Sequence, residues 1–253
     1  MTDTLFATEP ATDLCFGVLG PLALWSAGAR ETLTAPKLRG LLTLMLLDSV
    51  PVPAEQVRFV LDEGERWRDN TGPMHVAVHR LRRWLMQHGG HRLELEPAGY
   101  RLTVVGGEVD ARRFRHLVTT ANDRPDPAER AERLMAALAL WRGPVGADAP
   151  AAVRQQHAAR QLERLRRQAT VDLAVTCLDA GLSGQALPLI ERAAAEAPYD
   201  EQTQSLFALS LAACGLQAEA LDVIERTRQT LATELGIDPG HHLRDAQLRI
   251  LRP

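Results

Sequence analysis

The stretch that decides the N-terminal fold is "NTGPMHVAVHRLRRWLMQHGGHRLELEPAGYRLTV", residues 70–104. Pro73 near its start and Gly89-Gly90 in its middle are typical helix boundaries, so we expect a helix here, capped by Asn70 or Thr71. The two alternating runs around Pro97-Ala98-Gly99 predict a β-hairpin. A helix followed directly by a hairpin is the pattern that closes a winged helix-turn-helix.

The residues before this stretch complete the motif. Short apolar runs separated by glycine and proline in residues 14–36 predict strands. The leucine-rich residues 37–49 predict a buried helix, and residues 52–64 predict a shorter one with Pro53 in its first turn. Strands, three helices and a hairpin, in that order, predict a winged-helix domain over residues 14–107.

From Val109 onward the pattern is helical, which places a domain boundary near Gly106-Gly107 and a second domain at 108–253. The predicted helices cover roughly 110–121, 127–142, 148–181, 183–197, 200–214, 217–234 and 240–252. The predicted fold class is therefore mostly α with an α+β N-terminal part: a winged helix-turn-helix domain followed by an all-helical domain.

The second domain contains an internal repeat with an offset of 34 residues. The matched pairs are Val175 and Leu209, Gly181 and Gly215, Leu182 and Leu216, Ala186 and Ala220, Leu187 and Leu221, Ile190 and Ile224, Glu191 and Glu225, and Arg192 and Arg226. This offset is the period of a tetratricopeptide helix pair, with the glycine at the turn between the helices. The repeat predicts a tetratricopeptide-like interaction module.

The helix over residues 74–89 has one apolar and one basic face. Met74, Val78, Leu81 and Leu85 fall on a single stripe of the helical wheel, which predicts the buried side. The basic residues on the outer side are His75, His79, Arg80, Arg82 and Arg83. No acid neutralises this face within residues 74–89, although the whole chain has 29 basic and 32 acidic side chains and a net charge of −3.

Two interpretations of the basic face are open. It is either an ordinary solvated surface or the recognition helix of a DNA-binding domain. The second is favoured because the face lacks Glu–Arg pairs at helical spacing and because Val76 is apolar yet predicted to lie on it. Arginine binds phosphate or guanine edges, and valine can contact a thymine methyl group, although Val76 could instead pack against the preceding helix.

Four further residues are candidates for contacts with the DNA backbone. Tyr100 and Arg101 lie in the hairpin, where a wing would approach a phosphate or the minor groove, with core packing as the alternative for Tyr100. Lys37 and Arg39 open the first helix, whose N-terminus favours an anion, with simple solvation as the alternative.

Several functional classes find no support in the sequence. There is no P-loop, dinucleotide fingerprint, HExxH or nucleophile elbow, so we expect no catalytic residue, no cofactor and no enzyme. There is no His/Cys cluster with metal-ligand spacing, so we expect no metal site. Cys15, Cys177 and Cys214 are predicted to be buried free thiols in a cytoplasmic protein.

The N-terminal residues and the hydropathy of the chain bear on its location. Residues 1–13 are expected to form a disordered lead-in and not a signal peptide, because they are acidic and lack an apolar core. No run of about 18 apolar residues occurs, so we expect no membrane span.

The ordered set of motifs resembles the SARP family, the Streptomyces antibiotic regulatory proteins. "FGVLGPLALW", "PKLRGLLTLMLL" and "MHVAVHRLRRWL" followed by "PAGYRL" resemble its OmpR-like winged helix. "ALALWRGP" and "EALDVIERTRQTLATELGIDPG" resemble its bacterial transcriptional activation domain. The resemblance covers about residues 14–252.

The resemblance implies a transcriptional activator of a secondary-metabolite (antibiotic) gene cluster. Such proteins bind direct repeats in promoter DNA as side-by-side copies and recruit RNA polymerase holoenzyme, including its sigma factor. It also implies that the residues of the basic helix read DNA, with the wing residues and the start of the first helix at the backbone. Two alternatives stay open. One is a repressor with the same DNA domain. The other is a protein-interaction adaptor that has lost DNA binding, because the acids Glu63 and Glu65 at the end of the second predicted helix would repel phosphate.

Overall fold

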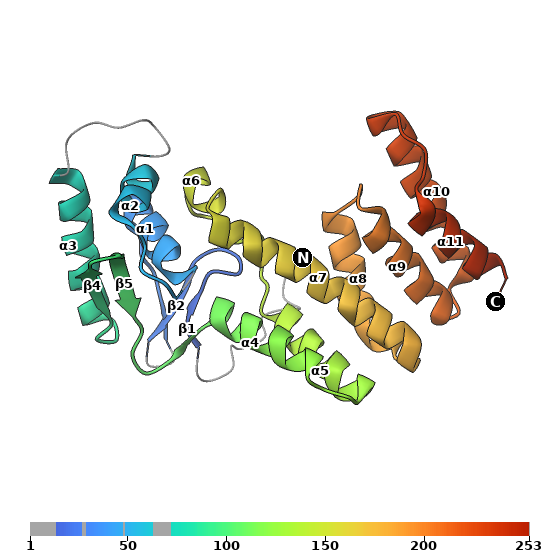
Figure 1. Cartoon of the computed structure of the whole chain (residues 1–253), viewed down its shortest axis with the longest axis horizontal. Helices are drawn as coiled ribbons and strands as arrows, with labels where there is room; N and C mark the ends of the chain where they lie inside the picture. Colours follow the sequence, from blue (N-terminus) through green and yellow to red (C-terminus); the bar gives the residue numbers. More distant parts are fainter. Residues whose placement is uncertain (1–13, 27–28, 48, 63–71, 253) are drawn as a thin grey trace. The chain divides into compact units, whose positions relative to one another are not determined.

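The computed structural model describes residues 14–26, 29–47, 49–62 and 72–252 (Figure 1). The predicted lead-in, the cap candidates Asn70 and Thr71, and the acids Glu63 and Glu65 lie outside the described residues. The chain divides into two compact units. The first comprises the residues up to Arg115 together with Leu140–Glu163, and the second comprises His116–Ala139 together with the residues from Arg164 onward.

The first unit has the element order predicted for a winged helix. Its elements are β1 (Leu14–Gly17), β2 (Ala23–Ser26), β3 (Ala29–Glu31), α1 (Pro36–Leu46), α2 (Ala54–Leu61), α3 (Gly72–Gln87), β4 (Arg92–Glu96), β5 (Gly99–Thr103), β6 (Glu108–Val109), the start of α4 (Asp110–Asn122), α6 (Ala151–Arg154) and the start of α7 (His157–Ala180). A four-stranded sheet has the order β3-β2-β1-β6, and β4 and β5 form a separate hairpin. The predicted fold class is confirmed.

The hairpin β4–β5 is the wing, and backbone hydrogen bonds connect it to the segment between α1 and α2. Val52 and Tyr100 exchange two backbone hydrogen bonds of 2.8 Å. Gly99 has a φ of +135°, and a Cβ atom at this position would overlap the Val52 carbonyl oxygen. Glycine is therefore required where the wing meets the segment between α1 and α2.

The short strand β6 was not predicted, and it organises the first unit. It pairs in parallel with β1, although the whole winged helix separates the two strands in sequence. This pairing brings Asp110, the first residue of α4, beside the end of β1. The Asp110 carboxylate is 1% exposed and accepts hydrogen bonds from the backbone N–H groups of Val18 at 2.8 Å and Leu19 at 3.0 Å.

Arg142 completes this arrangement from a distant part of the chain. Its Nη2 lies 3.1 Å from the Asp110 carboxylate, and its Nη1 donates to the carbonyl of Pro21 at 2.8 Å. Burial raises the pKa of the Asp110 carboxyl, and the two backbone N–H groups and Arg142 oppose that shift by stabilising the carboxylate. The neighbouring Trp141 packs edge-on against Phe114 with ring centroids 5.2 Å apart. Residues far apart in the sequence of the first unit thus meet at one buried group, the Asp110 carboxylate.

The second unit is entirely helical. Its elements are the rest of α4, α5 (Pro127–Ala139), the rest of α7, α8 (Ser183–Glu196), α9 (Glu201–Ala213), α10 (Gln217–Thr230), the π-helical segment η1 (Leu231–Leu235) and α11 (His241–Leu251). Side chains of α9, α10 and α11 form one apolar cluster, with Leu211, Ile224 and Ile250 among its members. Within the described ranges, no helix combines the length and the apolar character needed to cross a membrane.

Two predicted helices differ from the structure. The helix predicted over 148–181 is two helices, α6 and α7, separated by Gln155 and Gln156. The side chain of Gln156 donates to the carbonyl of Ala152 at 3.0 Å, so it satisfies an acceptor near the break and stabilises it locally. The helix predicted over 217–234 changes from α to π geometry after Thr230, and Gly236 ends it with a φ of +67°.

The 34-residue repeat is confirmed in detail. Gly181 and Gly215 both end helices in the left-handed region, with φ of +69° and +81°. The next residues make equivalent hydrogen bonds, from Leu182 N to Cys177 O at 2.8 Å and from Leu216 N to Leu211 O at 3.0 Å. The matched alanines and isoleucines of α8 and α10 are all buried. The second unit is therefore tetratricopeptide-like.

The cysteine prediction is wrong at one of three positions. Cys15 and Cys177 are buried free thiols, and burial raises the pKa of Cys15 to about 11. Cys214 is a free thiol but exposed, because it follows the last residue of α9 and lies outside the packed helix faces.

We predict that Asp110→Asn lowers the free energy of unfolding by about 3 kcal/mol, because the amide group would place donors against Arg142 and a backbone N–H. Asp148→Asn is the control, since exposed Asp148 also accepts a backbone hydrogen bond, from Leu22 at 2.7 Å. It should cost about 1 kcal/mol. Urea denaturation measures both, and equal losses would contradict the central role of Asp110.

Candidate nucleic-acid interface

Helix α3 is positioned by the apolar stripe that the sequence predicted. Met74, Val78, Leu81 and Leu85 are all buried, and α3 packs against α1, α2 and β4. Because these residues occupy one side of the helix, the opposite side faces solvent. The stripe therefore determines which basic residues of α3 are available to a partner.

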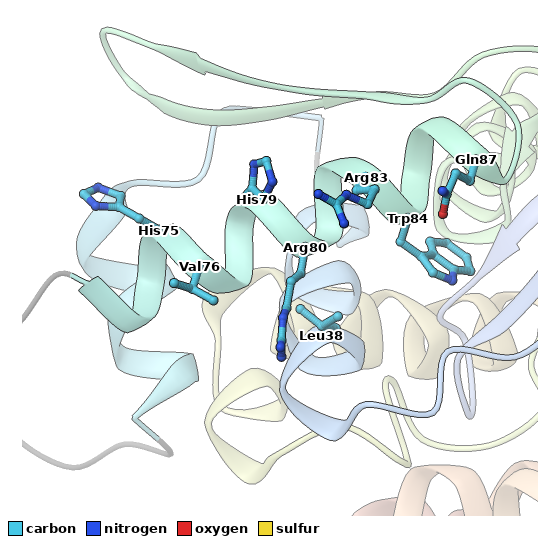
Figure 2. A pocket seen from close by; sticks show the side chains of 8 residues that line it. All are labelled: Leu38, His75, Val76, His79, Arg80, Arg83, Trp84 and Gln87. Carbon is cyan, nitrogen blue, oxygen red and sulfur yellow. The ribbon is translucent and has the colours of Figure 1, made fainter.

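A shallow groove of about 600 Å³ runs along the exposed side of α3 (Figure 2). The residues that line it are Leu38 of α1 and His75, Val76, His79, Arg80, Arg83, Trp84 and Gln87 of α3. Val76, Arg80 and Trp84 extend from the side of α3 on which Leu38 lies, with Arg80 reaching beside Leu38, while His79 extends from the other side of the helix (Figure 2). Within the described ranges, no acidic residue lines this groove.

The three arginines of α3 have different surroundings. Among the described residues, Arg80 and Arg83 have no ion-pair or hydrogen-bond partner, and both are exposed. Arg82 instead donates from Nε to the carbonyl of Leu93 in β4 at 2.6 Å. Arg80 and Arg83 are thus free to bind a partner, whereas Arg82 holds the wing against the helix.

Val76 is 56% exposed and lines the groove. The alternative interpretation, in which it packs against the preceding helix, does not fit this exposure. An apolar side chain between Arg80 and the two histidines is suited to contact the methyl group of a thymine.

The wing candidates are corrected by the structure. Tyr100 is 3% exposed, so its ring is a packing residue of the domain and cannot reach a nucleic acid. Arg101 pairs with Glu96 at 2.6 Å, and its Nη1 donates to the carbonyl of Ser49 at 2.9 Å. Its guanidinium therefore fastens β5 to the end of the α1 segment, because both partners belong to the domain itself.

The two candidates at the start of α1 also differ from each other. Lys37 is exposed, and the N-cap residue Ala35 provides no side-chain hydrogen bond to the first turn, so this turn has free N–H groups beside a cation. Arg39 is half-buried and lies 3.6 Å from Asp148. Lys37 is thus the stronger candidate for a phosphate contact.

Two further histidines, His88 and His91, do not extend the basic face of α3. The ring of His88 stacks on Trp84 at 4.2 Å. His91 is 4% exposed, lies against Phe16, and accepts a hydrogen bond at Nδ1 from the backbone N–H of Val105 at 3.1 Å. Burial lowers the pKa of His91, so its imidazole is neutral at pH 7. Through Val105 and Phe16, this side chain connects the residues after β5 with β1.

Sequence reasoning missed Leu38, Trp84 and Gln87. Trp84 continues the line of Val76 and Arg80 at intervals of four residues, and Gln87 follows Arg83 at the same interval, so the helical wheel contained the signal for both. Leu38 is on another helix, and no local pattern identifies it. Among the described residues, no group of three potential metal ligands comes together.

Comparison with known proteins identifies the family. The model of the bacterial transcriptional activator domain matches residues 109–251. MoaR1 of Mycobacterium tuberculosis, a transcriptional regulatory protein, is 30% identical over 94% of this chain and 79% of its own length. The chain belongs to the SARP family of transcriptional activators. AfsR of Streptomyces coelicolor, a regulatory protein, is 31% identical over 96% of this chain, which spans 25% of AfsR.

A solved structure supports the same family at the level of the fold. Mycobacterium tuberculosis EmbR, in complex with a low-affinity phosphopeptide, matches 95% of this SARP-family chain and 65% of its own with a TM-score of 0.74 and 30% identity. The relatives are transcriptional regulators, so the family assignment agrees with the absence of catalytic motifs in the sequence.

We predict that Arg82→Ala lowers the free energy of unfolding by about 1 kcal/mol, because it removes the hydrogen bond between α3 and β4. Arg80→Ala is the matched control and should leave stability within about 0.5 kcal/mol of wild type. Urea denaturation compares the two variants, and a larger loss for Arg80→Ala would contradict the roles assigned here.

We further predict a pH effect from His91. Its pKa is lowered in the folded state, so the unfolded state binds more protons and this contribution to stability is present above about pH 6.5 and lost as pH falls through the folded pKa. Protonation also removes the Nδ1 acceptor for Val105. The free energy of unfolding of His91→Gln, followed by urea denaturation between pH 5 and 8, should fall less steeply below pH 6.5 than that of wild type; parallel curves would contradict this role.

Proposed function

We propose that this SARP-family protein activates transcription by binding promoter DNA sequence-specifically through α3. The observation that carries the proposal concerns the described residues: Arg80 and Arg83 are exposed and have no partner among them, and they lie beside exposed Val76 in a groove to which no described acid contributes. A solvated helix face needs no apolar residue at its centre and usually pairs its arginines. A major groove offers phosphates, guanine edges and thymine methyl groups to this set.

The proposed contacts divide by chemistry. Arg80 and Arg83 bind guanine edges or phosphates, Val76 contacts a thymine methyl, and His75 and His79 donate to bases or phosphates. Lys37 and the first turn of α1 bind a backbone phosphate. Arg82 and Arg101 act indirectly by holding the wing.

The family resemblance extends the proposal to assembly. Two copies bind direct repeats upstream of the promoter of a secondary-metabolite cluster, in the cytoplasm and on the nucleoid, and recruit RNA polymerase holoenzyme with its sigma factor. Residues 14–107 serve as the DNA-binding domain and residues 108–253 as the activation domain. The 34-residue repeat of the second unit supports a role in protein–protein contact.

A mobility-shift titration with the promoters that neighbour its gene tests DNA binding. We predict that Arg80→Ala/Arg83→Ala weakens specific binding about 100-fold, since each arginine accounts for roughly 1–3 kcal/mol, and makes the salt dependence shallower if a phosphate contact is lost. Val76→Ala should weaken binding mainly to sites with a thymine at one position.

Arg244→Ala/Arg249→Ala is the control, because it removes the same charge from exposed positions of α11. If this variant loses as much affinity as the α3 variant, the effect is one of net charge and α3 is not the reader. If folded wild-type protein binds none of these promoters, the adaptor alternative replaces the proposal. The distance of the site from the −35 element, with a reporter assay, distinguishes activation from repression.

A further inference from the structure

A second groove lies in the tetratricopeptide-like unit, and none of its described lining residues is assigned to DNA. It has a volume of about 470 Å³ and is formed by α8, α9 and α10, three helices that pack side by side (Figure 1). Phe207, Leu211 and Val223 give it an apolar floor. Since these three residues come from α9 and α10, the packing of the repeat creates the floor.

The polar groups of this groove are almost all hydrogen-bond acceptors. Glu191, Glu219 and Asp222 line it, and Arg226 is the one cation among the lining residues that the structure describes. Arg226 is paired with Asp222 at 2.9 Å. Among the described residues, neither Glu191 nor Glu219 takes part in an ion pair or side-chain hydrogen bond, so the groove keeps two uncompensated carboxylates.

Two of the three uncharged polar side chains that line the groove, Gln204 and Thr227, have already donated their hydrogens, whereas the hydroxyl of Thr230 has no partner among the described residues. Gln204 is buried and donates from Nε2 to the carbonyls of Ala194 at 2.7 Å and Ala197 at 3.2 Å. Thr227 donates its hydroxyl hydrogen to the carbonyl of Val223 at 2.8 Å. What Gln204 and Thr227 can still offer to a ligand is a lone pair, so a ligand must supply the hydrogens for these contacts.

We propose that this groove binds a segment of a partner protein that carries an arginine or lysine next to apolar side chains. The cation would lie between Glu191 and Glu219, and the apolar side chains would lie on the floor formed by Phe207, Leu211 and Val223. Nucleic acid is not the occupant, because its phosphates would meet the uncompensated carboxylates. The groove thus provides a contact separate from DNA binding and opposite to it in charge.

Selection of a phage-displayed library of random dodecapeptides on the immobilised full chain tests the proposal. We expect enriched peptides to combine arginine or lysine with neighbouring Leu, Phe or similar residues. By fluorescence anisotropy, the best peptide should bind Glu191→Gln/Glu219→Gln about fivefold or more weakly than wild type. Ala195→Arg, which adds a cation at an exposed position of the groove, should abolish binding.

Two matched controls accompany these variants. Glu225→Gln/Asp245→Asn removes the same charge elsewhere in the unit, at the repeat equivalent of Glu191 and on α11, and Ala218→Arg adds a cation outside the groove. Both should bind the peptide like wild type. No enrichment, enrichment of peptides without basic residues, or equal losses in the controls would overturn the proposal. All four variants should bind promoter DNA as wild type does, so failure here is distinguishable from failure of the DNA-binding proposal.

Discussion

The first unit depends on one buried carboxylate. Asp110 is the first residue of α4, and it accepts hydrogen bonds from Val18 and Leu19 at the end of β1 and from Arg142. These partners come from two distant parts of the chain, and the pairing of β1 with β6 places Asp110 beside the end of β1. A buried carboxylate is tolerated only when its oxygens are satisfied, so the strand, the helix start and the segment with Arg142 must all be in place together. The winged helix is consequently not closed by its own residues: Arg142 belongs to the range that matches the activation-domain family.

Five arginines of the first unit fall into two groups with different physical roles. Arg82, Arg101 and Arg142 direct their guanidinium groups to acceptors within the domain, where they hold the wing and the sheet. Arg80 and Arg83, on the same helix as Arg82, have no such partner among the described residues and face the groove beside Val76. Arg82 and its neighbours Arg80 and Arg83 therefore have different roles. Successive residues of a helix are rotated by about 100°, which places Arg82 against β4 and directs Arg80 and Arg83 toward solvent.

The two grooves have opposite charge. Of the residues that the structure describes, histidines and arginines but no acid line the groove of α3, whereas carboxylates and one paired arginine line the groove of α8–α10. Although the net charge is only −3, basic and acidic side chains gather in different grooves. The proposed DNA and the proposed basic peptide would therefore bind at different sites and would not compete. The regular repeat supports this arrangement, because equivalent glycines and buried isoleucines keep the helices in register.

The sequence by itself determined the order of the elements, the apolar stripe of α3, the repeat of 34 residues and the family. These features are local or periodic, and helix caps, alternation and helical spacing express them directly in neighbouring residues. Only the tertiary structure decided that Tyr100 is buried, that Arg82 and Arg101 donate to carbonyl groups of the same domain, that β6 pairs with β1, and that Cys214 is exposed. It also decided that Leu38 joins the groove of α3. Each of these outcomes depends on contacts between residues far apart in the chain, or on which neighbours cover a given side, and a single sequence holds no periodic signal for either.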